Sequence, residues 1–168
     1  MSKIIIRELE GKDTEKFVEY TKLIGSQTQN LSYGAEGINK SQSEIETFIK
    51  TTRSSINSVL LGAWEKDNLI GVANLNNRHG RMSHRADLGL SVIKSRWNLG
   101  FGSMLMSSLK SFAKTKNIEI INLEVRADNK PAIHLYEKFG FVKKGDFPAY
   151  FKIGSNYIDF ILMCLDLR

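Results

Sequence analysis

The chain has 168 residues, 42% of them hydrophobic, and carries a formal net charge of +6 at pH 7. This length suits one domain over residues 1–168 with a sizeable core, and the hydrophobic content excludes a disordered chain. The longest apolar runs are too short to span a bilayer, and the first residues lack the apolar stretch of a signal peptide. The positive charge is compatible with nucleic acid, a membrane surface or a polyanionic small ligand.

Hydrophobic periodicity divides the chain into strands and helices. Strands are expected over residues 4–9, 59–64, 69–75, 86–93, 118–125, 141–144 and 157–167. Helices are expected over residues 13–24, 41–52, 101–113 and 131–139, with polar loops at 25–40 and 76–84. The resulting order, β-α-α-β-β-β-α-β-α-β-β, predicts a mixed α/β (α+β) domain.

Local signals mark the ends of several elements. Asp13 suits a cap for the first helix, and Ser41 with Glu44 fits a capping box ahead of the second. Asp67-Asn68 predicts a hairpin turn between the second and third strands. Gly140 is expected to end the last helix.

The single cysteine, Cys164, lies in an apolar, strand-like run and is expected to be a buried structural thiol. One cysteine forms no internal disulfide, so we expect a cytoplasmic protein. No group of Cys and His residues has the spacing of metal ligands, and we expect no metal.

Two glycines stand between the strand at 86–93 and the helix at 101–113, within Asn98-Leu99-Gly100-Phe101-Gly102-Ser103. Backbone N–H groups gathered at a helix N-terminus bind anions well, although a tight turn alone also explains the glycines. The loop is no dinucleotide fingerprint, because Leu105 replaces the third glycine, and no P-loop Gly-Lys-Ser/Thr follows. Five cations precede this loop and either form a solvated surface or include some that screen bound phosphates: Arg78, Arg81, Arg85, Lys94 and Arg96.

A second segment, Asn129 to Phe141, carries an apolar stripe at helical spacing that includes Tyr136. This tyrosine is either a core residue or a proton donor at the edge of a cleft. A tyrosine hydroxyl has an ordinary pKa of about 10, above the roughly 8.5 of a thiol, so it stays protonated at neutral pH. It is therefore able to protonate a leaving thiolate.

Together these two segments resemble the GNAT superfamily of N-acetyltransferases. The first is similar to the Q/R-x-x-G-x-G/A motif, with Trp97 in place of Gln or Arg, and the second to N-x-x-A-x-x-L-Y-x-x-x-G-F. The resemblance is specific over residues 87–141 and extends elsewhere through the element order. It implies a single domain whose mixed, mostly antiparallel sheet is flanked by helices. It also implies direct acetyl transfer from acetyl-CoA to an amine of an amino acid, polyamine, protein N-terminus or lysine.

The resemblance assigns roles to individual residues. Tyr136 would be the general acid, and Asn129 would touch the pantetheine arm or fix the strands, unless it only caps the helix. Backbone groups of the preceding strand would hold the pantetheine, with an N–H near Val92 facing the thioester oxygen: Ser91, Val92 and Ile93. The loop would wrap the pyrophosphate: Asn98, Leu99, Gly100, Phe101, Gly102 and Ser103.

An amine must lose a proton before it attacks, and Asp87 and Glu124 are the candidate bases, unless alternation points them away. In this family the acceptor site lies among the first two helices, their loop and the last hairpin, which offer Tyr33, Glu36 and Tyr157. A non-catalytic acyl-CoA-binding module is the alternative. We expect no nucleic-acid or membrane partner, because net charge alone supports one, and a homodimer is left open.

Overall fold

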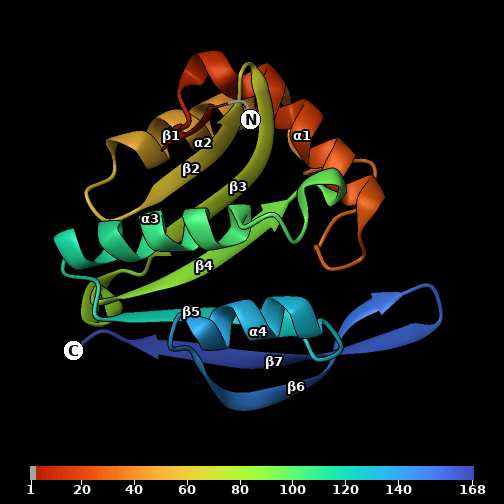
Figure 1. The fold of residues 1–168 in the computed structure, drawn as a ribbon, viewed down its shortest axis with the longest axis vertical. Helices are drawn as coiled ribbons and strands as arrows, with labels where there is room; N and C mark the ends of the chain where they lie inside the picture. The colour runs from red at the N-terminus through yellow and green to blue at the C-terminus, as the bar shows by residue number, and fades with distance from the viewer. Residues whose placement is uncertain (1–2) are drawn as a thin grey trace.

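A twisted seven-stranded sheet runs through the computed structural model, which describes residues 3–168 (Figure 1). The strand order is β1-β2-β3-β4-β5-β7-β6, and every neighbouring pair is antiparallel except β4 with β5. The mixed, mostly antiparallel sheet and the expected element order are both confirmed. The strands are β1 (Ile4–Glu8), β2 (Val59–Glu65), β3 (Asn68–Asn77), β4 (Arg85–Val92), β5 (Ile120–Arg126), β6 (Val142–Ile153) and β7 (Asn156–Asp166).

Helices cover both faces of this sheet. On one face α1 (Thr14–Gln27) and α2 (Gln42–Ser54) lie over the β1–β3 half, and on the other lie α3 (Phe101–Thr115) and α4 (Lys130–Lys138) (Figure 1). The expected capping box of Ser41 and Glu44 is present. Gly140 follows α4 with φ +97°, a left-handed conformation that favours glycine. Within residues 3–168, no helix combines the length and hydrophobicity needed to cross a bilayer.

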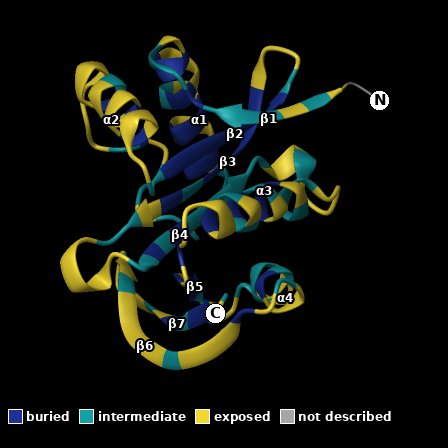
Figure 2. Cartoon of the chain, turned by 90° about the vertical axis from the view of Figure 1, so that its left-hand side faces the viewer, coloured by how far each residue is buried: buried dark blue, intermediate teal, exposed yellow. Residues whose placement is uncertain are grey.

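Two hydrophobic cores hold these layers together. Under α3 and α4, buried side chains come from the helices and from alternate sheet positions, including Leu105, Leu109, Ile121, Leu123 and Phe141. Under α1 and α2, a smaller core contains Phe17, Ile24, Ile45, Ile49 and Trp64. Figure 2 shows the buried residues concentrated in the central strands, whereas β6 at the sheet edge is largely exposed. Each fully buried aliphatic side chain contributes about 1.5–3 kcal/mol. Cys164 is buried, as expected.

Strands β4 and β5 separate soon after they begin. Their parallel pairing covers only Arg85–Asp87 against Ile120–Asn122. Beyond this point β5 continues beside β7, and β4 keeps only β3 as a neighbour. The backbone edge of β4 from Leu88 to Val92 is therefore left without a strand partner on one side. This unpaired edge is where the candidate site is built.

The structure corrects the expected strand at residues 141–144, because β6 continues to Ile153. Its register against β7 shifts between Lys143 and Gly145 and again between Phe147 and Phe151, at two bulges. These bulges accommodate Gly145 and Pro148, which interrupt the alternating pattern in the sequence. An edge strand tolerates such interruptions because one of its backbone sides needs no partner.

Smaller corrections concern element ends. The turn between β2 and β3 is Lys66-Asp67, one residue earlier than expected, because Glu65 pairs with Asn68. Lys66 adopts the left-handed conformation there, with φ +54°. The Asp13 side chain caps no helix N–H of α1; it receives two hydrogen bonds from Arg7, at 2.6 and 2.9 Å.

Candidate active site

The unpaired edge of β4 presents backbone groups to the space that β5 leaves open. The N–H of Ile93 donates to the Ile70 carbonyl at 3.0 Å, so odd-numbered residues of this region direct their backbone groups toward β3. The N–H and C=O groups of Leu90 and Val92 consequently face away from β3. Of the expected pantetheine-binding residues, the structure leaves the Val92 N–H available and engages the N–H of Ile93. Ser91 instead shares a hydroxyl–hydroxyl hydrogen bond of 2.9 Å with Tyr20.

The glycine loop forms a concave set of N–H donors at the start of α3. Asn98 and Gly100 have positive φ values of +58° and +86°, which turn the chain so that α3 begins at Phe101. The N–H groups of Phe101, Gly102 and Ser103 form the first helical turn and have no intrahelical acceptors. A Cβ added at Gly102 would stand 3.0 Å from the Leu135 side chain of α4. The loop therefore suits an anion and packs closely against the helix that carries Tyr136.

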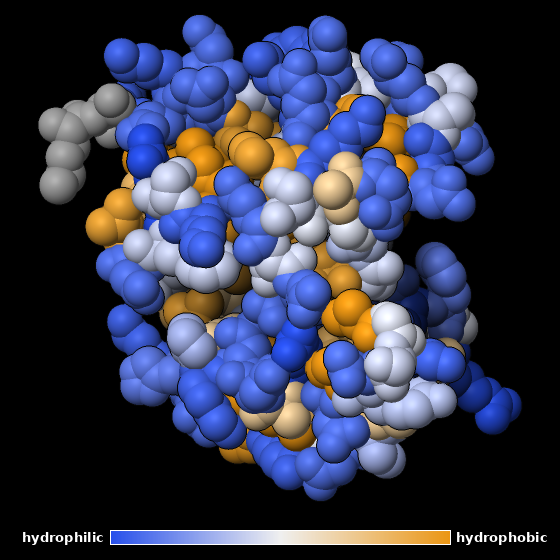
Figure 3. Space-filling model, turned by 90° about the vertical axis from the view of Figure 1, so that its right-hand side faces the viewer, coloured by the Kyte–Doolittle hydropathy of each residue, from blue (hydrophilic) through white to orange (hydrophobic). Residues whose placement is uncertain are grey.

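Apolar side chains are exposed around this loop. Trp97, Leu99 and Met104 are among the exposed large hydrophobic residues. Figure 3 views the side of the molecule where β4 ends and α3 begins, and hydrophobic atoms reach the surface near its centre. An exposed apolar cluster beside a set of anion-binding donors is typical of a ligand groove.

Trp97 connects the loop to β4. Its indole N–H donates to the Val92 carbonyl at 2.6 Å, and its backbone N–H donates to the Lys94 carbonyl at 3.2 Å. The side chain thus holds the loop against the same β4 residue whose N–H faces the gap. This contact was not predicted, because the motif places Gln or Arg at this position.

The basic residues near the motif do not surround the loop. Arg78, Arg81 and Arg85 lie at the beginning of β4 or in the preceding connection, at the opposite end of the strand from the glycines. Only Lys94 and Arg96 adjoin the loop, and Arg96 is paired with Glu65 of β2. Of the five cations, these two alone stand next to the loop, and the other three fit the alternative of a solvated basic surface.

Tyr136 projects from α4 into the interior with only 6% of its surface exposed. Its ring packs on Phe141 at 5.8 Å between centroids, and its hydroxyl has no hydrogen-bond partner among residues 3–168. Burial raises the pKa of this hydroxyl to about 12. The group therefore remains a protonated donor throughout the neutral range. Asn129 caps α4 by accepting the Ala132 N–H at 3.4 Å.

The two candidate bases differ in their surroundings. Asp87 receives both a 2.9 Å and a 2.8 Å hydrogen bond from the Arg78 guanidinium, which engages both carboxylate oxygens. Glu124 is exposed and forms no ion pair with any described residue. Asp87 pairs with Asn122 across the sheet, and Glu124 follows two residues later, so both carboxylates lie on the same face. Glu124 is the one with free oxygens.

An aromatic group on β6 and β7 adjoins these carboxylates. Tyr150 lies 4.9 Å from Phe160 and 5.3 Å from Phe147 between ring centroids. Partial burial raises the pKa of the Tyr150 hydroxyl, and the negative charges of Glu124 and Asp87 raise it further. Sequence patterns did not indicate this contact, because β6 was expected to end before Tyr150.

The connection between α1 and α2 links the ends of the two separating strands. The Gln27 side chain accepts the Lys94 N–H at 2.8 Å, just after β4, and the Gln29 carbonyl accepts a 3.3 Å hydrogen bond from Arg126 of β5. The expected acceptor residue Tyr33 is half-buried in this connection, and burial raises its pKa. Glu36 accepts the Gly34 N–H at 2.8 Å within the connection itself. The third expected residue, Tyr157, is exposed at the start of β7 beside Lys152.

Comparison with known proteins identifies this arrangement. The family model described as "Acetyltransferase (GNAT) family" matches residues 27–141. This chain belongs to the GNAT family. A solved GNAT-family acetyltransferase from Streptococcus pneumoniae is 30% identical, with a TM-score of 0.94 over 98% of this chain and 99% of that one. The expected resemblance and fold are thereby confirmed.

Two curated relatives match a shorter region. An L-amino acid N-acetyltransferase of Escherichia coli is 38% identical over 47% of this chain, and an N-alpha-acetyltransferase of Sulfurisphaera tokodaii is 34% identical over 41%. The chain spans about half the length of these relatives, 49% and 42% respectively. The yncA protein of Salmonella typhimurium, solved with its cofactor acetyl-CoA, shares the fold at 16% identity and a TM-score of 0.86, covering 99% of this chain and 95% of that one.

The GNAT site of this chain fits acetyl-CoA. The N–H groups of the first turn of α3 suit the pyrophosphate, and the Val92 N–H on the unpaired β4 edge suits the amide-rich pantetheine arm. The buried Tyr136 hydroxyl offers a proton donor on the adjacent helix. Within residues 3–168, no three His, Cys, Asp or Glu side chains are grouped to hold a metal ion.

We expect Trp97→Phe to raise the KM for acetyl-CoA and to leave the KM for the amine unchanged. Phenylalanine keeps an aromatic ring and removes the indole N–H that holds the loop to Val92. One hydrogen bond contributes about 0.5–1.5 kcal/mol, so the KM for acetyl-CoA should rise roughly two- to tenfold. Initial rates with each substrate varied in turn will measure this. An unchanged KM for acetyl-CoA would show that the Trp97 contact has no role in binding.

Proposed function

We propose that this GNAT protein transfers the acetyl group of acetyl-CoA to a primary α-amine. The observation that carries the proposal is the combination at the β4 edge. Unpaired backbone donors of β4 lie beside the N–H cradle of α3, and Tyr136 stands on α4, which packs against that cradle through Leu135. The choice of an α-amine rests on the names of the two curated relatives, an L-amino acid N-acetyltransferase and an N-alpha-acetyltransferase.

Acetyl-CoA supplies the activated acetyl thioester. In the proposed reaction Glu124 accepts a proton from the acceptor ammonium, directly or through water, because its carboxylate is exposed and has no ion-pair partner among the described residues. The Val92 N–H stabilises negative charge on the carbonyl oxygen during attack. The C–N bond forms and the C–S bond breaks as Tyr136 donates its proton to the departing sulfur, and the second proton lost by the new amide nitrogen returns to Tyr136 directly or through water. Binding both substrates together supplies much of the rate. We assign the base to Glu124 rather than Asp87, whose oxygens are engaged by Arg78.

The first test is stabilisation by acetyl-CoA. A ligand that binds only the folded state at about 100 times its Kd stabilises it by about 2.7 kcal/mol, or roughly 5–10 °C for a chain of this size. We expect Gly102→Glu to abolish this shift, because it places bulk and negative charge in the cradle, 3.0 Å from Leu135. Differential scanning fluorimetry will measure both.

Gly145→Glu is the matched control. It introduces the same charge on β6, where an added Cβ meets nothing within 4 Å, and the acetyl-CoA shift should persist. Absence of any shift with the unaltered protein would contradict cofactor binding. Acetyl-CoA could raise the melting temperature while no amino acid, polyamine or peptide in a panel causes release of the CoA thiol. That result would favour the alternative, a non-catalytic acyl-CoA-binding module.

A further inference from the structure

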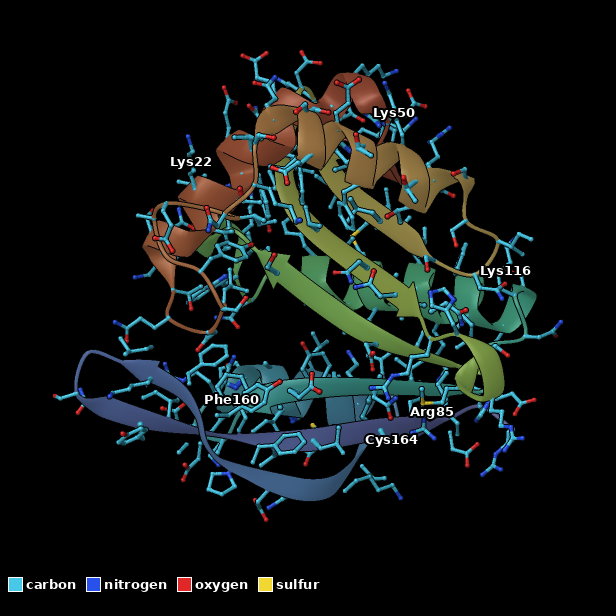
Figure 4. All side chains as sticks on the ribbon, turned by 180° about the vertical axis from the view of Figure 1, so that it is seen from behind. Lys22, Lys50, Arg85, Lys116, Phe160 and Cys164 are labelled. Atoms are coloured by element: carbon cyan, nitrogen blue, oxygen red, sulfur yellow. The ribbon has the colours of Figure 1, made fainter. Side chains whose placement is uncertain are left out.

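The sheet face below α1 and α2 carries a row of polar groups on β4 and β5. By alternation, Arg85 and Asp87 of β4 and Asn122 and Glu124 of β5 point to this face, and Arg78 joins them from the preceding connection. We call these five residues the acceptor floor. Figure 4 views this face from behind the molecule, with Arg85 near one end of β5 and Phe160 near the other. The acceptor floor therefore includes the proposed base, Glu124.

The charges of the acceptor floor are not all compensated. Arg78 and Asp87 form a two-point ion pair and neutralise one another. Arg85 contacts only a neutral group, the Asn122 side-chain oxygen, to which it donates at 2.8 Å. Within residues 3–168, no carboxylate lies within ion-pair distance of Arg85. Its partly buried guanidinium therefore presents a positive charge and further N–H donors to the floor.

Asn122 provides an independent indication of a missing ligand. The side chain is 4% exposed, and its amide nitrogen has no hydrogen-bond partner in the described part of the chain. A buried donor without a partner costs about 1–3 kcal/mol, and such groups point to a function or an unseen partner. Its oxygen is already bound by Arg85, so this donor belongs to the same carboxamide that the guanidinium contacts. Both groups are donors, and both therefore favour an anion.

The spacing along β5 defines the kind of anion. Asn122 and Glu124 are two residues apart on the same face, about 7 Å at the rise of a strand. At the Asn122 position, the Arg85 guanidinium and the Asn122 amide offer hydrogen-bond donors. At the Glu124 position, the carboxylate oxygens offer acceptors. One carbon atom separates the ammonium and carboxylate of an α-amino acid, so its two charged ends can reach these two points together.

We propose that Arg85, supported by Asn122, binds the carboxylate of a free α-amino acid whose amine faces Glu124. This inference rests on the proposed function and narrows its acceptor to a zwitterion. Arg85 is a specificity residue in this scheme and takes no part in the proton transfers. The neighbouring aromatic group of Tyr150, Phe151 and Phe160 favours an apolar side chain on that amino acid.

The experiment compares acids with their amides. L-leucine, L-methionine and L-phenylalanine are each tested beside the corresponding amide and a dipeptide beginning with the same residue, with CoA release measured. We expect the free acids to have kcat/KM values at least about tenfold higher, the usual scale of one charge-assisted hydrogen bond. In Arg85→Gln that preference should disappear, through a higher KM for the acids and unchanged constants for the amides.

Arg81→Gln is the matched control, because it removes the same charge from an exposed residue in the connection that precedes β4. It should keep the acid preference. Equal use of acids, amides and dipeptides, or an Arg85→Gln variant with an unaltered preference, would overturn the carboxylate site while leaving acetyl transfer intact. A preference for dipeptides would assign the floor to a protein N-terminus instead. No acetylation of any amine would overturn both proposals.

Discussion

Tyr136→Phe is expected to lower kcat by about a hundredfold, the usual scale for loss of a general acid. Phenylalanine keeps the ring that packs on Phe141 and removes only the hydroxyl, which has no hydrogen-bond partner among the described residues. The KM for acetyl-CoA and the melting temperature should change little for the same reason. Steady-state and single-turnover rates of thiol release will measure the effect.

The dependence of activity on pH is a second test of the role of Tyr136. With its pKa raised to about 12, Tyr136 stays protonated as the pH rises through the whole assay range. We therefore expect no loss of activity on the alkaline side, up to about pH 10, from ionisation of this tyrosine. An unchanged single-turnover rate in Tyr136→Phe would show that the residue belongs only to the core.

Glu124→Gln should produce the second large effect, a fall in kcat/KM of about a hundredfold or more near pH 7. The amide cannot accept the proton that the acceptor ammonium must lose. The deficit should shrink as the pH rises toward the pKa of the amine, because an amine that is already neutral needs no base. Rates between pH 6 and about pH 10 will define this trend.

Asp87→Asn is the appropriate comparison. This substitution removes a charge from the same face, but from a carboxylate that Arg78 already engages at 2.8 and 2.9 Å. We expect the fall in its kcat/KM at low pH to match that of the unaltered enzyme. If this fall disappears in Asp87→Asn and persists in Glu124→Gln, the assignment of the base is reversed. If both keep it, a chain of water molecules or the free amine itself removes the need for a base.

Local sequence patterns predicted most of the helices and strands and the residues expected to bind acetyl-CoA. The capping box at Ser41 and the stop at Gly140 are short-range features, and the structure has both. The glycine at 100 indicated a turn into a helix because few other residues adopt φ near +86°. The proposal for Tyr136 depended on a motif, since a lone tyrosine on an apolar stripe is equally a core residue.

The acceptor side was beyond the reach of sequence patterns because its contacts join distant segments. Arg78 lies nine positions from Asp87, and Arg85 lies 37 positions from Asn122. Nothing in the local sequence shows that the Asp87 carboxylate is paired with an arginine, or that the Arg85 guanidinium contacts an amide and no described carboxylate. Tyr150 lies in the last hairpin, where acceptor contacts were expected, but its place on β6 was not predicted, because two bulges carry that strand past a glycine and a proline and periodicity does not register bulges.

The link between Arg126 and the α1–α2 connection has an evolutionary consequence. Arg126 recognises a main-chain carbonyl, that of residue 29, so the bond does not depend on which side chain stands there. Substitutions at the exposed positions among residues 30–40 can therefore accumulate while the connection stays joined to β5. A lineage could acquire a new acceptor by drift in this segment, without rebuilding the scaffold that holds the cofactor.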